Sequence, residues 1–402
     1  MRRGSLKGLV MIHIRGRIEE YIRRQRDILI GLSADFTGIL AGFASSLLIP
    51  YLGRVEWILF VIPLLLTVRG AVNGAFSGRL TTGLNIGTIY PRLRGNTEEF
   101  GVLVTVMLLV GVLNSTLAAI IIGIYSANFV KFIVALVVLV DLFFVAACFS
   151  VVITSLVGFF AYKRNIDPDA VVYPIMSTVN DIFGSLLLLL IIVLLEPWDT
   201  LSAFVRGLPI LLISVLTVLH MLRRYHRSEM FKRTVAEIYP AIIFSLILSS
   251  FAGFLLSLLE KRIISHPGIL VALPAMMDTI GDVGAIVASS ITTRLHIGTI
   301  ELKFRSILTV FLQLPDYMIP LALLASSYAL FGAILSGMIA DFPYLLTMYL
   351  AVSLIGMMVI LPLSLSIATI TFKYGLNPDN LSIPILTAIT DLLTVIMVYM
   401  LA

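Results

Sequence analysis

Long apolar stretches follow one another along almost the whole chain, and this pattern limits the fold more than any other feature. Hydrophobic residues make up 59% of the sequence and charged residues only 13%, which excludes an ordinary soluble domain. About 20 apolar residues cross the hydrocarbon core of a bilayer as a helix. We therefore predict an all-α polytopic membrane protein with about eleven transmembrane helices, at residues 28–52, 56–79, 100–124, 132–161, 170–195, 200–221, 238–259, 268–293, 315–339, 343–372 and 380–401.

The basic residues predict which ends of these helices face the cytoplasm. If the N-terminus is inside, the inside segments carry 22 Lys and Arg and the outside segments only 5. Positive charge accumulates on the cytoplasmic side of membrane proteins, so we expect the N-terminus inside the cell and the C-terminus outside, in the cell membrane. The loop charges set this topology, and the net charge of +5 does not indicate a nucleic-acid partner. The basic segment 1–27 is typical of an amphipathic helix on anionic lipid.

The chain contains an internal repeat. Shifting the sequence by 211 residues aligns residues 63–89 with 274–300, and 10 of 27 positions are identical without a gap. A shift of 210 aligns residues 165–181 with 375–391, including Asp181 with Asp391. Each repeat has five spans, and an odd number would invert the second copy. The additional span at about 200–221 restores the orientation, so we expect two parallel repeats related by a pseudo-twofold axis along the membrane normal.

These observations divide the chain into four parts. We predict the basic N-terminal segment at 1–27, a first five-helix repeat at 28–195, a linker with the additional helix and a basic cytoplasmic loop at 196–237, and a second repeat at 238–402. Because one chain then contains both halves of a pseudo-dimer, we expect that the protein can be a monomer.

Carboxylates lie where the chain is expected to cross the membrane, and they are expensive there. Asp278 and Asp282 are one helical turn apart and point from one helix face. Asp181 and Asp391 hold equivalent positions in the two repeats, so the pseudo-twofold brings them toward each other. Like charges in a low dielectric repel unless they are protonated or bridged by a cation. Carboxylate oxygens suit Mg²⁺, Ca²⁺ or Mn²⁺, and we predict a cation site at these four residues.

The acidic residues within the predicted spans also have alternative interpretations. Asp278 and Asp282 could instead be tethered to Arg69 as structural partners. Asp141 has no twin, because Val352 is its counterpart, and it could bind a coupling ion such as Na⁺ or H⁺ or join two helices. Asp35 is close to the predicted interface, which favours a structural role.

Small and polar residues near the acids are candidates for lining the ion path. Gly70 and Gly281 hold equivalent positions, and we expect close helix packing there, with a backbone opened toward an ion as the alternative. The further candidates for coupling or path lining are Asp141, Asn73, Asn180, Thr67, Ser177 and Thr387.

Four motifs in this order resemble the membrane domain of the MgtE magnesium channels and, more closely, the magnesium transporters of solute carrier family 41. The run "PLLLTVRGAVNGAFSGRLTTGLN" is similar to the family pattern P…K-G-N…S-R-L-S-T…N, and "PAMMDTIGDVGA" to its second-half P…G-G-N. "PIMSTVND" and "PILTAITD" resemble the P-x-x-T-x-x-x-D element, with Ser177 replacing the threonine in the first half.

The resemblance implies transport of Mg²⁺, with Asp181 and Asp391 as central ligands of a largely hydrated ion. It also shows where this chain differs. The family asparagine is Ala71 in the first half and Asp282 in the second, so an amide ligand is lost on one side and becomes a carboxylate on the other.

Two other functions fit parts of the pattern. An intramembrane aspartyl protease also uses paired membrane aspartates, but "TIGD" lacks the second glycine of that motif. A proton-coupled carrier of another solute is the stronger alternative, since membrane carboxylates relay protons. We expect no enzyme activity and no catalytic cofactor, with Mg²⁺ or a related divalent cation as the transported ion and membrane lipid as the surroundings.

Overall fold

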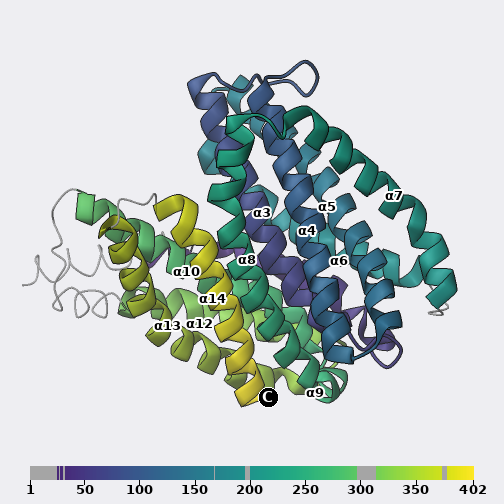
Figure 1. Cartoon of the computed structure of the whole chain (residues 1–402). Coiled ribbons are helices and arrows are strands. Elements are labelled where there is room, and N and C mark those ends of the chain that lie inside the picture. The colour runs from purple at the N-terminus through teal and green to yellow at the C-terminus, as the bar shows by residue number, and fades with distance from the viewer. Residues whose placement is uncertain are drawn as a thin grey trace, which may run out of the picture.

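The computed structural model describes residues 25–26, 28–29, 32–166, 168–194, 200–296, 314–373 and 378–402. All regular elements in this part of the chain are helical (Figure 1). They are the 3₁₀ helices η1 (Ser33–Thr37), η2 (Ile49–Tyr51) and η3 (Ile339–Asp341) and the α-helices α2 (Gly38–Ser46), α3 (Ile58–Ile86), α4 (Glu98–Ser126), α5 (Phe129–Lys163), α6 (Pro168–Leu194), α7 (Thr200–Tyr225), α8 (Glu229–Leu258), α9 (Glu260–Ser265), α10 (Gly268–His296), α12 (Leu314–Leu335), α13 (Phe342–Lys373) and α14 (Pro378–Leu401).

The predicted spans fall on these helices. Nine helical segments of the described residues are long and apolar enough to cross a bilayer. The two other predicted spans correspond to α6 and α14, whose apolar parts Thr178–Leu194 and Ile385–Leu401 are shorter. The all-α polytopic membrane fold is thus confirmed. The predicted amphipathic helix at 1–27 lies almost entirely outside the described residues, and the four predicted part boundaries stay predictions.

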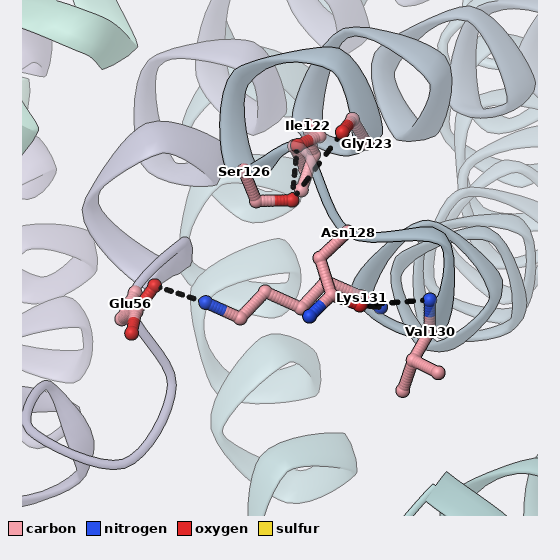
Figure 2. A network of polar contacts seen from close by, with 7 residues as sticks. All are labelled: Glu56, Ile122, Gly123, Ser126, Asn128, Val130 and Lys131. Carbon is pink, nitrogen blue, oxygen red and sulfur yellow. Dashed lines mark hydrogen bonds and ion pairs between the residues drawn. The ribbon is translucent and has the colours of Figure 1, made fainter.

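Short polar turns join the long helices. Between α4 and α5 the Asn128 side-chain oxygen accepts the backbone N–H groups of Val130, at 2.9 Å, and Lys131, at 3.2 Å (Figure 2). These two bonds satisfy amide groups that have no partner inside the helix. The Lys131 ammonium lies 2.5 Å from a carboxylate oxygen of Glu56, in the turn before α3. A link this short makes α4 and α5 antiparallel neighbours.

The first helix of each half packs across the middle of the molecule. We call α2 to α6 the first half and α8 to α14 the second half, with α7 between them in sequence. α2 packs on α6 of its own half and on α10 of the other, and α8 packs on α14 of its own half and on α3 of the other. α7 lies at the outer edge of the first half, against α4 and α5 (Figure 1). The two halves are therefore interlocked rather than merely adjacent.

Glycines bring these crossing helices into backbone contact. A β-carbon at Gly42 of α2 would clash with the carbonyl oxygen of Val271 on α10. A β-carbon at Gly253 of α8 would clash with the carbonyl oxygen of Phe60 on α3. Gly42 and Gly253 are 211 residues apart, and so are Phe60 and Val271, which is the shift that aligns the repeats. The two crossings are one packing arrangement formed twice.

Candidate cation site

The central carboxylate of the second half is held by the first half. The Thr67 hydroxyl on α3 donates a hydrogen bond of 2.6 Å to the Asp391 carboxylate on α14, and both side chains are buried. Helices from the two halves thus meet at Asp391. Asp181, its counterpart on α6, is also buried. That Asp181 and Asp391 share one ion remains a prediction.

Asp278 and Asp282 lie half-buried on α10, one turn apart as expected. The Asp282 and Asp391 carboxyl groups interact electrostatically. Since α10 and α14 also pack against each other, the acids of the second half form a connected group around Asp282. Asp282 therefore connects Asp391 with α10, and the cation site predicted at Asp181, Asp391, Asp278 and Asp282 stays a prediction.

Asp35 belongs to the same group, although the sequence favoured a structural role near the interface. It lies in η1 and is 7% exposed. Its carboxyl group is within hydrogen-bonding reach of the Asp282 carboxyl group and of the Thr279 hydroxyl group. It also interacts electrostatically with Asp278. The sequence signal that could have placed it is the Gly38-x-x-x-Gly42 pattern directly after it, which brings α2 onto α10.

Two hydroxyl groups lie next to this acidic group, one on α10 and one on α12. Tyr328 on α12 and Thr279 on α10 lie 2.6 Å apart between their oxygens, and Thr279 also donates to the Ala275 carbonyl at 2.9 Å. Both side chains are buried. Neutral oxygens are therefore available next to the carboxylates.

The first half contains a chain of neutral polar groups instead. The Asn180 amide on α6 donates to the Ser150 hydroxyl on α5 at 3.2 Å, and Ser150 donates to the Asn73 side-chain oxygen on α3 at 2.8 Å. The Asn73 amide nitrogen is buried without a hydrogen-bond partner. Asn73 and Asn180 were predicted to line the path, and Ser150 was missed, because a hydroxyl in an apolar helix usually bonds its own backbone.

One face of α3 is built from small residues and leads to Thr67. Gly70, Gly74, Gly78 and Thr82 follow Thr67 at three- or four-residue steps, so all five lie on the same side of the helix. Gly70 and Gly74 are partly exposed, and Gly78 and Thr82 are exposed. A β-carbon added to Gly70 or Gly78 would have no neighbour within 4 Å. This face of α3, which we call the glycine face, borders open space at Gly70 and Gly78, and Thr67 with its hydrogen bond to Asp391 lies at its other end.

The equivalent face of α10 is closed at Gly281. A β-carbon there would lie 3.3 Å from the Thr390 hydroxyl and 3.7 Å from the Thr387 methyl group, both on α14. The expectation of close packing is therefore confirmed at Gly281 and wrong at Gly70, where open space borders the helix. Thr387, a predicted path residue, takes part in this close packing.

Asp141 lies apart from these contacts, on the side of α5 that faces α7. It is 3% exposed, and one of its carboxylate oxygens is buried without a hydrogen-bond partner. A β-carbon at Gly207 of α7 would lie 2.9 Å from the other oxygen, so Gly207 makes room for the carboxylate. A coupling role for Asp141 stays a prediction. The side chains of Ser177 and Arg69 lie outside the described part of the structure.

In the described part of the chain, no group of three or more His, Cys, Asp or Glu side chains is arranged to hold a metal ion. The acids thus do not form a closed, dehydrated metal centre of the kind found at structural sites. An ion that keeps part of its water shell, as Mg²⁺ usually does, needs no such centre.

Comparison with known proteins identifies the family. The model described as "MgtE: Divalent cation transporter" matches twice, at residues 62–191 and 273–401. Solute carrier family 41 member 3 from Mus musculus is 24% identical over 414 residues, covering 92% of this chain and 81% of that protein. No solved structure matches. The two family matches begin within α3 and α10 and together span most of both halves, so the chain belongs to the MgtE family of divalent cation transporters.

Proposed function

We propose that this protein transports Mg²⁺ along the glycine face of α3 to a site that Asp391 and Asp181 share. The observation that carries the proposal is the hydrogen bond from Thr67 to Asp391 at the inner end of that face. It fixes a buried carboxylate of one half against the other half, one turn of α3 away from the open space at Gly70. The family supports a divalent cation as the substrate, and the oxygen ligands favour a hard ion.

The chemistry of Mg²⁺ fits such a path. The ion dehydrates reluctantly and is usually bound through one or two carboxylates with several waters retained. Thr67 uses its proton to bond one Asp391 oxygen, which leaves other carboxylate lone pairs free to accept from ion-bound water. The absence of β-carbons along the glycine face provides width for a hydrated ion.

Asp278 and Asp282 contribute to the same function from α10. Their counterparts in the first half are Thr67 and Ala71, so the negative charge is concentrated on the second-half side. Carboxylates of one sign in a low-dielectric region attract a divalent cation strongly. We propose that they draw the ion toward Asp391.

The same proposal includes the orientation in the cell membrane, with the N-terminus in the cytoplasm and the C-terminus outside, through the loop charges given above. The exposed end of the glycine face, at Thr82, then opens to the cytoplasm. One chain provides both halves, so a monomer is the proposed functional unit. Labelling of residue 402 from the cytoplasmic side only would contradict this orientation.

We also propose that transport is coupled to Na⁺ or H⁺, with Asp141 on the coupling path. Asp141 is buried, retains an unpartnered oxygen and has no acidic twin in α13. An ion or proton there is the simplest partner for that oxygen. Flux measured at fixed membrane potential, with and without a Na⁺ or pH gradient, decides the matter when wild type is compared with Asp141→Asn. Full gradient dependence in the variant would exclude Asp141.

The test of the substrate uses the purified chain in proteoliposomes. Uptake of Mg²⁺, Ca²⁺, Mn²⁺ and organic solutes is compared with that of protein-free liposomes. We expect Mg²⁺ uptake that the other divalent ions inhibit by competition. Uptake of an organic solute driven by a pH gradient, without divalent flux, would favour the proton-coupled carrier instead.

A further inference from the structure

Three carboxyl groups meet where the first half crosses the second. Asp35 comes from η1, and Asp278 and Asp282 come from α10. Asp35 is within hydrogen-bonding reach of Asp282 and interacts electrostatically with Asp278. A β-carbon at Gly38, three residues after Asp35, would lie 3.2 Å from an Asp278 oxygen. The backbone contact between α2 and α10 thus places the start of α2 directly against these acids.

One carboxyl oxygen in this group has no hydrogen-bond partner. The second oxygen of the Asp35 carboxyl group, Oδ2, is buried and has no hydrogen-bond partner, in a residue that is only 7% exposed. Buried polar atoms in proteins are nearly always paired, with protein, water or an ion. Asp35 therefore presents an unpaired acceptor within a cluster of two other carboxyl groups.

The other crossing of the molecule is an internal control for packing. At the α8–α3 crossing, Leu246, Thr67 and Ala71 hold the positions that correspond to Asp35, Asp278 and Asp282 after the shift of 211. Both crossings nevertheless have the same glycine contact, Gly42 on Val271 and Gly253 on Phe60. The three acids are thus not needed to form such a crossing, and acids within the membrane that do not serve packing favour a role in ligand binding.

We propose that Asp35, Asp278 and Asp282 bind a second divalent cation, beside the Asp391 site and at only one of the two crossings. Three carboxyl groups this close repel one another in a low dielectric unless a cation or protons compensate them. The hydroxyl groups of Thr279 and Tyr328 supply neutral oxygens nearby. The ion keeps part of its water shell, because the acids are not arranged to hold a metal directly.

This site joins the two halves, because Asp35 belongs to one and α10 to the other. A bound cation would hold η1 against α10 and stabilise the α2–α10 crossing specifically. Asp35 lies outside both segments that match the family model, so its role does not follow from the family. The identity of the ion rests on the proposed function, whereas the location of the site does not.

The test counts bound Mn²⁺ by electron paramagnetic resonance on the purified full chain in nanodiscs. We expect about two Mn²⁺ ions per chain at saturation, in keeping with sites formed by carboxylate oxygens. Asp35→Asn, which preserves the shape of the side chain, should weaken one of them roughly tenfold or more. Asp35→Leu, which copies Leu246, should do the same. Asp391→Ala should weaken the other ion and leave the Asp35-dependent one.

Three results would overturn the site. They are wild-type protein that binds no Mn²⁺, unchanged Mn²⁺ binding in both Asp35 variants, and loss of all Mn²⁺ binding in Asp391→Ala. A Mn²⁺-dependent rise in melting temperature that Asp35→Asn abolishes provides an independent readout of the bridge. If wild type shows no divalent flux but an Asp35-dependent Mn²⁺ ion, the proposed transport function fails and the site stands.

Discussion

The α2–α10 and α8–α3 crossings share a backbone arrangement and differ in charge. Each places a glycine of a first helix against a carbonyl oxygen of a second helix, at positions 211 residues apart. At the first crossing the side chains include Asp35, Asp278 and Asp282, and at the second their counterparts are Leu246, Thr67 and Ala71. The two repeats thus share the glycine contact at both crossings, whereas the acids occur at only one crossing. The comparison separates residues that build the membrane fold from residues that we propose bind the ion.

The largest expected effect comes from adding a side chain at the two glycine contacts. Gly42→Ala and Gly253→Ala each introduce a β-carbon onto a backbone carbonyl, which cannot move without displacing its helix. We expect each to lower the free energy of unfolding by about 1–3 kcal/mol, and by similar amounts at the two crossings. Thermal unfolding in detergent measures this. Gly53→Ala, whose β-carbon would meet nothing within 4 Å, is the control. A stable Gly42 variant would show that the crossing is not as close as described.

Giving the α2–α10 crossing the residues of the other crossing tests the role of charge. Asp278→Thr with Asp282→Ala copies Thr67 and Ala71 onto α10. We expect Mg²⁺ flux to fall roughly 10- to 100-fold, because the ligands are lost. The melting temperature should not fall, since like charges are removed from a buried region. A double variant with normal flux would mean that the asymmetry is incidental.

Thr67 allows a test at the α8–α3 crossing, next to the proposed ion path. Thr67→Val preserves shape and removes the hydrogen bond to the Asp391 carboxylate, a type of bond with a net value of about 1.5–3 kcal/mol. We expect Mg²⁺ flux to fall roughly tenfold, corresponding to about 1.4 kcal/mol. The matched control is Thr390→Val, because the Thr390 hydroxyl donates to the Thr387 carbonyl of its own helix. Equal losses in the two variants would remove the special role of Thr67.

The smallest effect on flux is expected in the chain of neutral polar groups of the first half. Ser150→Ala removes the hydroxyl that links Asn180 to Asn73 and leaves both amides short of a partner. We expect the free energy of unfolding to fall by about 1–3 kcal/mol, the penalty for unpaired buried polar groups, with flux reduced only slightly. Ser364→Ala in the second half loses only a bond to its own helix and should cost less. Urea or thermal unfolding of the two variants, measured side by side, compares the halves directly.

Much of the fold followed from the sequence because the bilayer fixes the length of an apolar helix. All eleven predicted spans fall on helices, and the shift of 211 that aligns the repeats reappears in the glycine contacts. Asp278 and Asp282 could be placed on one helix face from their spacing alone. These predictions rest on periodicity and length, which are local properties of the chain.

The missed residues depend on contacts between distant segments. Asp35 reaches Asp282 across 247 positions only because Gly38 and Gly42 bring α2 onto α10, and neither glycine was singled out by hydropathy. Ser150 joins two asparagines from different helices, and no spacing within α5 predicts this. The open space beside Gly70 also depends on how α3 packs against its neighbours, whereas its counterpart Gly281 is closed by α14.

The central claim is that a divalent cation passes between the equivalent carboxylates of the two halves. The most direct measurement is Mg²⁺ flux into proteoliposomes for Asp181→Ala and Asp391→Ala, each shown by its melting curve to be folded. The account predicts that either substitution abolishes flux, because both carboxylates are ligands on one path. Flux in both variants equal to that of the wild type would contradict it.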